Sequence, residues 1–176
     1  MANGNATFRH SNVALLGLAE IVAPNVVTSH EFDERLADTL TTLGLPTGLL
    51  QRVAGVESRR NWDQPSDFVA GAVAAGGKAL AEAGVEPGAS LMVNTSVTRE
   101  HLEPSVAVGV HAGIGLGPQA MNFDIANACL GFVNGMTLAA NMIDAGQIDY
   151  ASSSPARTPP ASRRPRCAAS PATHHP

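Results

Sequence analysis

A chain of 176 residues, with a formal charge of −4 and 44% hydrophobic residues, has the composition of one globular domain rather than of an intrinsically disordered protein. Four of the 11 basic residues and none of the 15 acidic ones lie in residues 152–176, so residues 1–151 are strongly acidic. This acidic body argues against nucleic-acid binding, because phosphate contacts need a positive surface. The longest apolar runs are far shorter than 18 residues, which predicts no membrane span.

The cysteines and the first residues of the chain bear on its compartment. Two cysteines, Cys129 and Cys167, are too few for a disulfide framework. Polar residues interrupt every apolar stretch near the N-terminus, which does not match the layout of a secretory signal peptide. These patterns predict a reduced, cytoplasmic protein.

The first third of the chain predicts a strand, a helix and an irregular segment. Residues 13–18 form a short apolar run that is typical of a buried strand. Thr28 and Glu31 have the spacing of a capping box, which predicts a helix from Thr28 to about Leu43. The polar segment 55–62 is expected to be a loop or a sheet edge.

From residue 68 onward, helical and strand patterns alternate. Glycines at positions 84 and 146 are expected to end two of the helices, and Pro104 is expected to be the first residue of another. The sequence predicts helices over 68–83, 104–113 and 130–145, and strands over 91–93, 121–125 and 147–151. This alternation indicates parallel βαβ units in a layered α/β domain over residues 1–151.

The final predicted strand has a start but no apolar body, because Ser-Ser-Ser-Pro follows Ala151. Residues 152–176 contain six Pro and four Arg but no Val, Leu, Ile or Phe, which predicts a disordered tail. One interpretation is a basic linker or interaction arm. The other is a frame-shifted reading of a GC-rich gene, since GC-rich codons for Ser-Ser-Ser-Pro-Ala encode Val-Val-Ala-Gly in another frame. The DNA sequence after the Tyr150 codon would decide between them.

Cys129 lies between a predicted strand that ends at Ile125 and a predicted helix that contains Gly131. This is the layout of a nucleophile elbow, in which a sharp turn presents the side chain at a helix N-terminus. The positive end of the helix dipole favours the reactive thiolate. The alternative is a buried structural cysteine, because cysteine is among the most commonly buried residue types. The local pattern leaves both interpretations open.

Four segments, in the same order along the chain, resemble the 3-oxoacyl-acyl-carrier-protein synthase III family of the thiolase superfamily: 23–29, 54–60, 103–105 and 123–132. The resemblance extends over about residues 10–151. Within this group, segments 62–64, 94–105 and 127–130 are similar to the acyl-CoA condensing enzyme of long-chain olefin biosynthesis. Glu103 and Leu130 stand where the ordinary synthase usually has Phe and Ser.

The resemblance implies a fold and a reaction. The fold would be the N-terminal αβαβα half of a thiolase-like enzyme, with a mostly parallel, mixed sheet that is incomplete here. Cys129 would accept an acyl group from an acyl-CoA or acyl-carrier-protein thioester, and a second thioester would attack it in a Claisen condensation. Glu103 matches the general base, which reaches across a homodimer interface. The alternative for Glu103 is a solvated residue that precedes a helix. No cofactor and no metal are implied.

The resemblance also bears on the other polar residues. Arg59, Arg60 and Trp62 match a region that can contact the pantetheine or nucleotide part of the thioester, although they also suit a solvated loop. His101 and His111 are expected to be surface or packing residues, because the family's catalytic His and Asn belong to its C-terminal half.

Motifs that would supply the family's His and Asn have no counterpart in these 176 residues. We therefore expect the chain as written not to catalyse condensation. The alternative function is a non-catalytic half-domain that binds an intact condensing enzyme or an acyl carrier.

Overall fold

The computed structural model describes residues 7–64, 67–85, 88–99 and 101–154. The predicted tail lies outside this part of the chain from Pro155 onward, as does Cys167. The elements, in chain order, are β1 (Asn25–Thr28), α1 (Ser29–Arg35), α2 (Ala37–Thr42), α3 (Leu49–Ala54), β2 (Ser58–Asn61), α4 (Asp67–Ala83), β3 (Leu91–Asn94), α5 (Val106–Ile114), β4 (Met121–Asp124), a 3-10 turn (Ala128–Leu130), α6 (Gly131–Asp144) and β5 (Ala151–Ser154).

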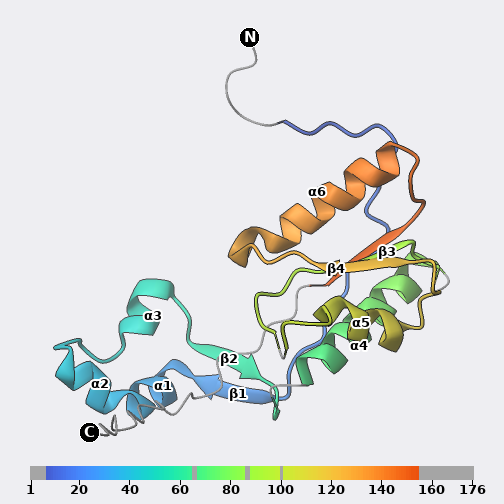
Figure 1. Cartoon of the computed structure of the whole chain (residues 1–176). Helices are drawn as coiled ribbons and strands as arrows, with labels where there is room; N and C mark the ends of the chain where they lie inside the picture. Colours follow the sequence, from blue (N-terminus) through green and yellow to red (C-terminus); the bar gives the residue numbers. More distant parts are fainter. Residues whose placement is uncertain (1–6, 65–66, 86–87, 100, 155–176) are drawn as a thin grey trace, which may run out of the picture.

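A parallel three-stranded sheet in the order β4-β3-β5 forms the centre of the fold. Its middle strand, β3, is fully buried, and Val93 lies opposite Phe123 on one side and Ser153 on the other. Helices α4 and α5 cover one face of the sheet, and α6 covers the other (Figure 1). The predicted layered α/β arrangement with parallel strands is therefore confirmed.

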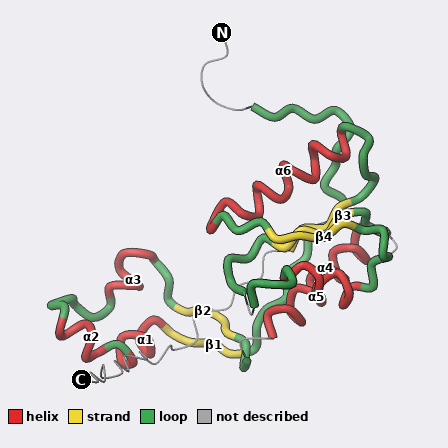
Figure 2. Tube along the Cα trace, in the orientation of Figure 1, coloured by secondary structure: helices red, strands yellow, loops and turns green. Residues whose placement is uncertain are grey.

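A second, two-stranded sheet pairs β1 with β2 in antiparallel fashion and carries α1, α2 and α3 beside it (Figure 2). The prediction that 55–62 is a sheet edge is confirmed by β2. Strand β1 was not predicted, because its four residues are too few for a periodic pattern. Its pairing depends on residues 30 to 36 positions away in the sequence.

The predicted capping box is confirmed at the start of α1. The Thr28 side chain accepts a hydrogen bond from the Glu31 backbone N–H (3.1 Å), and the Glu31 carboxylate accepts one from the Thr28 N–H (2.7 Å). The single helix predicted to reach Leu43 is wrong, because the chain leaves helical geometry at Leu36. The bend allows the chain beyond α2 to return, so that Asp33 accepts a hydrogen bond from the Gly48 N–H (2.6 Å).

The bounds of α5 and of β5 also differ from the sequence prediction. Helix α5 begins at Val106 rather than at Pro104, because the first N–H groups of the helix, from Val106 and Ala107, donate to the Asp124 carboxylate. The strand predicted over 147–151 begins only at Ala151 and continues through Ser154. Residues 152–154 therefore belong to the sheet and not to the tail, since β3 supplies the backbone partners that make a strand of them.

The strand predicted over residues 13–18 is also wrong. These residues run alongside the domain but pair with no strand of the described chain. An apolar run becomes a strand only where a neighbouring backbone completes its hydrogen bonds, and no strand among the described residues pairs with this segment. Leu15, Leu16 and Leu18 consequently remain 67%, 52% and 67% exposed.

The serines of β5 lead to a stability prediction. The Ser153 hydroxyl oxygen is buried and has no hydrogen-bond partner among the described residues. Ser153→Ala is expected to raise the free energy of unfolding by about 1 kcal/mol, because it removes a desolvated, unpaired hydroxyl. Urea denaturation measures this change. Ser29→Ala is the control of opposite sign, because the Ser29 hydroxyl donates to the Val56 carbonyl and its loss leaves that oxygen unpaired. A destabilised Ser153→Ala variant would contradict the prediction.

Asp144, at the end of α6, anchors the N-terminal segment and predicts an acid transition. Its carboxylate accepts hydrogen bonds from the backbone N–H groups of Ser11 (3.0 Å) and Asn12 (2.9 Å), and these two bonds hold the pKa of Asp144 below its usual range. A lowered folded-state pKa stabilises the anchored state above the unfolded-state pKa, and this contribution is lost as the pH falls through the folded-state pKa.

The amide resonances of Ser11 and Asn12 should therefore titrate together at acid pH. NMR spectra recorded over a pH series measure this, and Asp144→Asn should remove the transition. An unchanged titration in the variant would contradict the assignment.

Within the described residues, no helix combines the length and the apolar character that a bilayer crossing requires.

Candidate active site at the β4–α6 turn

Cys129 lies in the 3-10 turn that joins β4 to α6. The preceding residue, Ala128, has a φ of +41°, a left-handed conformation that non-glycine residues seldom adopt. The predicted sequence of strand, sharp turn and helix is confirmed. Cys129 is an exposed, free thiol, so the alternative of a buried structural cysteine is wrong for this chain. The turn presents a nucleophile to solvent at the start of a 14-residue helix.

Close packing beneath this turn fixes its position. A Cβ atom at Gly131 would lie 2.8 Å from the Thr95 carbonyl oxygen and 3.3 Å from that of Ile125. A Cβ atom at Gly135, one helical turn later, would lie 2.8 Å from the Thr95 Cγ2 atom. Only glycine lets the first turn of α6 sit directly on the end of β3. The sequence showed that small residues occur here, but not which backbone atoms they contact.

A polar network lies beside the turn, at the C-terminal ends of β3 and β4. Asp124 accepts hydrogen bonds from the Asn94 amide (3.1 Å), the Val106 N–H (3.0 Å) and the Ala107 N–H (2.9 Å). Asp124, the last residue of β4, therefore caps the N-terminus of α5. Sequence reasoning missed this role, although an acid that ends an apolar strand was a usable signal. The network ties the loop before α5, which carries Glu103, to the strand that leads to Cys129.

Glu103 is exposed and lies just before α5. No hydrogen bond or ion pair joins it to Cys129 in the described part of the chain. Two apolar side chains in the same loop, Val97 (58% exposed) and Leu102 (77% exposed), also face solvent. An exposed carboxylate in a loop that also exposes apolar side chains fits both a solvated residue and a residue at an uncovered interface, so the predicted role of Glu103 stays a prediction.

The three predicted substrate-binding residues do not form one cluster. Arg59 points toward α1, where its guanidinium carbon lies 4.6 Å from the centroid of the Phe32 ring. Arg60, on the other side of β2, places Nη1 3.4 Å from the Pro24 carbonyl oxygen, and Trp62 packs against Gly71 of α4. Alternation along a strand explains this separation. Contact with a thioester stays a prediction for all three.

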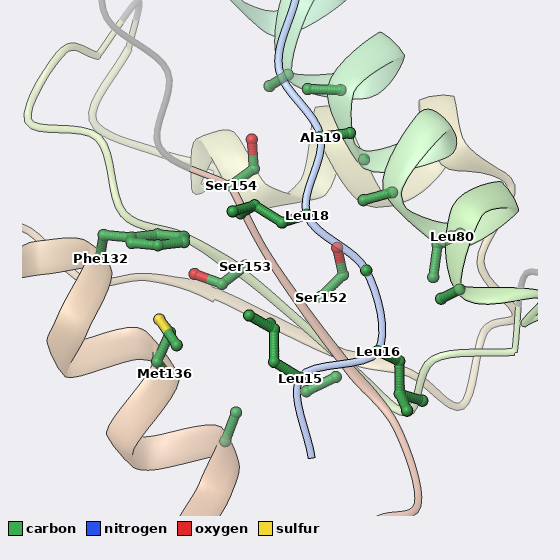
Figure 3. Close-up of a pocket in the computed structure, with 18 of the residues that line it drawn as sticks. Leu15, Leu16, Leu18, Ala19, Leu80, Phe132, Met136, Ser152, Ser153 and Ser154 are labelled. Atoms are coloured by element: carbon green, nitrogen blue, oxygen red, sulfur yellow. The ribbon is translucent and has the colours of Figure 1, made fainter.

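A cavity of about 930 Å³, which we call the β5 slot, lies between β5 and the unpaired residues 13–22. Residues of α4 and α6 form its walls (Figure 3). Arg60 and Trp62 are also among the residues that line it. Neither Cys129 nor Glu103 lines it. The slot is therefore separate from the nucleophile turn.

Within the described residues, no hydrogen bond or ion pair joins a histidine to Cys129. His111 Nε2 lies 3.1 Å from the Gly117 carbonyl oxygen, which confirms its expected packing role, and His101 is exposed. His174 and His175 lie outside the described residues. In the part of the chain that the structure describes, no three His, Cys, Asp or Glu side chains lie close enough together to hold a metal ion.

The fold is thiolase-like. The crystal structure of a histidine-to-asparagine variant of Xanthomonas campestris OleA matches it with a TM-score of 0.77 and 45% sequence identity over 85% of this chain. A 3-oxoacyl-(acyl carrier protein) synthase III from Xanthomonas oryzae pv. oryzae matches it with a TM-score of 0.78, also at 45% identity over 85% of this chain. The match covers 44% of each of those chains.

Curated sequences give the same assignment. An acyl-CoA:acyl-CoA alkyltransferase of X. campestris is 48% identical over 142 residues, which are 80% of this chain and 42% of that protein. A β-ketoacyl-[acyl-carrier-protein] synthase III of Rhodospirillum rubrum is 33% identical over 134 residues, 76% of this chain and 39% of that protein. No family profile matches the chain. The chain belongs to the synthase III-like condensing enzymes of the thiolase superfamily, and it spans less than half the length of these relatives.

Proposed function

We propose that this chain carries the acyl-accepting part of a condensing enzyme that acts on acyl thioesters. The observation that carries the proposal is the exposed, free thiol of Cys129 in the turn between β4 and α6. A relative supports the choice of substrate: a Cys-to-Ser variant of X. campestris OleA has been crystallised with lauric acid and lauroyl-CoA. The proposed donor is accordingly acyl-CoA, with an acyl-carrier-protein thioester as the related alternative.

In the first step, the Cys129 thiolate attacks the carbonyl carbon of the thioester. The new C–S bond forms as the bond to the coenzyme A sulfur breaks, and coenzyme A leaves as a thiolate that takes up a proton. In the second step of the intact reaction, a base removes an α-proton from a second acyl thioester. The resulting carbanion attacks the acyl-enzyme, and Cys129 leaves to give a 3-oxoacyl product.

We assign the base to Glu103, acting in the site of a partner subunit across a homodimer interface. Val97 and Leu102, two exposed apolar side chains of the loop that carries Glu103, support this assignment, because a surface that a partner covers is often apolar. The free thiol of Cys129 supports the proposal that the protein works in a reduced, cytoplasmic setting. Sedimentation analysis of the isolated 176-residue chain measures whether it forms a dimer through this surface.

The proposal predicts one round of acyl transfer without turnover. With lauroyl-CoA, the 176-residue chain should release about one equivalent of coenzyme A and then stop, because the family's His and Asn motifs have no counterpart in the sequence. A thiol-reactive dye measures the released coenzyme A. Cys129→Ser should eliminate the burst, whereas Glu103→Gln should leave it intact. The absence of a burst would overturn the proposed nucleophile, and continuous release of a 3-oxoacyl product would overturn the expected lack of condensation.

The second candidate function, a half-domain that binds an intact condensing enzyme, is favoured by one surface. Leu130, Val133 and Met136 are 60%, 55% and 38% exposed and lie at helical spacing along the start of α6. Light scattering of this chain mixed with an intact synthase III tests the idea. A stable complex that forms equally well with Cys129→Ala would favour binding over catalysis, and the absence of a complex would remove this candidate.

A further inference from the structure

We propose that Asn127 and Asn134 form a clasp that holds the Cys129 turn in its shape, so that both act as positioning residues, an inference that rests on the proposed acyl transfer to Cys129. The Asn127 side-chain amide donates a hydrogen bond of 2.6 Å to the Asn134 side-chain oxygen. Asn127 lies just before the 3-10 turn, and Asn134 lies at the end of the first turn of α6. The bond therefore closes a ring of chain that contains the nucleophile.

The Cys129 turn needs support from outside its own backbone. Ala128 has a φ of +41°, and the Cβ atom of any residue other than glycine makes this left-handed conformation unfavourable. Within the turn, the Leu130 N–H donates to the Asn127 carbonyl oxygen (2.9 Å). The Gly131 N–H donates to the Ala128 carbonyl oxygen. These are hydrogen bonds of a 3-10 turn, which have poorer geometry than those of an α-helix, and a strained turn persists only where other contacts hold it.

The clasp supplies such a contact from the side chains. Among the described residues, no side chain caps the first residues of the 3-10 turn or of α6. Asn127 occupies the capping position of the 3-10 turn, yet its side chain reaches across to α6 instead. The close approach of Gly131 to the end of β3 fixes the start of the helix. The clasp ties the residues before that start, Cys129 among them, to the helix.

A held turn matters for acyl transfer because the Cys129 sulfur must meet the thioester carbonyl carbon at a set distance and angle. A loose turn spends part of its time in other shapes, and the rate of attack falls in proportion. The loss of one typical hydrogen bond corresponds to about a fivefold change in such an equilibrium. A small reagent such as iodoacetamide approaches an exposed thiol from many directions, so its reaction with Cys129 should not depend on the clasp.

Asn134→Ala tests the clasp. At saturating lauroyl-CoA, the rate constant of the coenzyme A burst should fall about fivefold, while the size of the burst and the half-saturating concentration stay unchanged. A merely structural role would instead reduce the size of the burst, because unfolded molecules do not react. Alkylation of Cys129 by iodoacetamide, measured by peptide mapping, should keep its rate. Asn141→Ala, at another exposed asparagine of α6, is the matched control and should leave all of these values unchanged.

Two further variants separate the bond from the residues that make it. Asn134→Asp keeps an acceptor for the Asn127 amide, so it should restore the ratio of the acylation rate to the alkylation rate. Taking the ratio cancels the effect of the added charge on the thiol. The double variant Asn127→Ala/Asn134→Ala should be no slower than either single variant, because each removes the same bond. Both side chains are exposed, so every variant should keep its fold, and thermal denaturation checks this.

Three results would overturn the clasp. They are an unchanged burst rate in Asn134→Ala, additive slowing in the double variant, and failure of Asn134→Asp to restore the ratio. The absence of a burst in the parent chain would overturn the proposed function instead. Hydrogen exchange of the Leu130 N–H, which donates within the turn, then decides the clasp by itself. Asn134→Ala should speed this exchange about fivefold, and unchanged exchange would overturn the clasp.

Discussion

Gly131→Ala is expected to lower the free energy of unfolding by about 3 kcal/mol and to prevent acyl transfer to Cys129. The added methyl group would lie 2.8 Å from the Thr95 carbonyl oxygen and 3.3 Å from that of Ile125. Both contacts are with backbone atoms, which cannot rotate away as a side chain could. The start of α6 must shift away from β3, and overpacking of this kind typically costs 1–3 kcal/mol. The same shift displaces the turn that carries Cys129.

Urea denaturation and the coenzyme A burst measure the two effects. Gly77→Ala is the matched control, because Gly77 also lies within a helix but a Cβ atom there would meet nothing within 4 Å. That variant should be as stable as the parent or about 1 kcal/mol more stable, since alanine is favoured over glycine inside helices. Equal stability of the two variants would show that the contact beneath Cys129 is not rigid.

Asp124→Ala is expected to destabilise the protein by about 2–3 kcal/mol. The substitution removes the acceptor for the Val106 and Ala107 N–H groups and for the Asn94 side chain, all of which are buried residues. A buried donor left without a partner costs about 1–3 kcal/mol, and the effect is partly shared within one network. The start of α5 should fray, and the loop that carries Glu103 should lose its anchor.

Asp124→Asn separates the charge from the hydrogen bonds. An amide oxygen still accepts one bond but cannot accept from both N–H groups through two oxygens, so this variant should lose less stability than Asp124→Ala. Hydrogen exchange at Val106 and Ala107 locates the effect. Normal protection of these amides in Asp124→Ala would contradict the capping role.

Local signals in the sequence were sufficient for several parts of the fold. The capping box at Thr28 depends on two residues three positions apart, and the end of α4 depends on Gly84, which has a φ of +65°. The strand–turn–helix around Cys129 was also predictable, because it follows from an apolar run, small residues and a helical pattern in direct succession. Each of these features is set by residues that are neighbours in the chain.

The features that sequence reasoning missed depend on distant contacts. Strand β1 exists because β2 pairs with it, and Ser152–Ser154 form a strand because β3 offers them a backbone. Residues 13–18 have the right composition for a strand but no neighbour in the described chain to pair with. The capping of α5 by Asp124 joins residues 17 and 18 positions apart. Composition shows what a segment prefers, and only the assembled sheet shows what it pairs with.

The chemistry of the candidate site depends on both kinds of information. The resemblance of four segments predicted roles for Cys129 and Glu103, and the structure places the Cys129 thiol in an exposed, tightly packed turn. It also separated Arg59 from Arg60, which the sequence had treated as a pair. That separation follows from strand alternation, which becomes visible only once β2 is known to be a strand.

The central claim is that Cys129 accepts an acyl group, and peptide mapping after brief exposure to lauroyl-CoA tests it most directly. The chain has a second cysteine, Cys167, which serves as an internal control for nonspecific acylation. Mass spectrometry of the digested protein should find one lauroyl group in thioester linkage on Cys129 and none on Cys167. Equal labelling of the two cysteines, or labelling of Cys167 alone, would contradict the account.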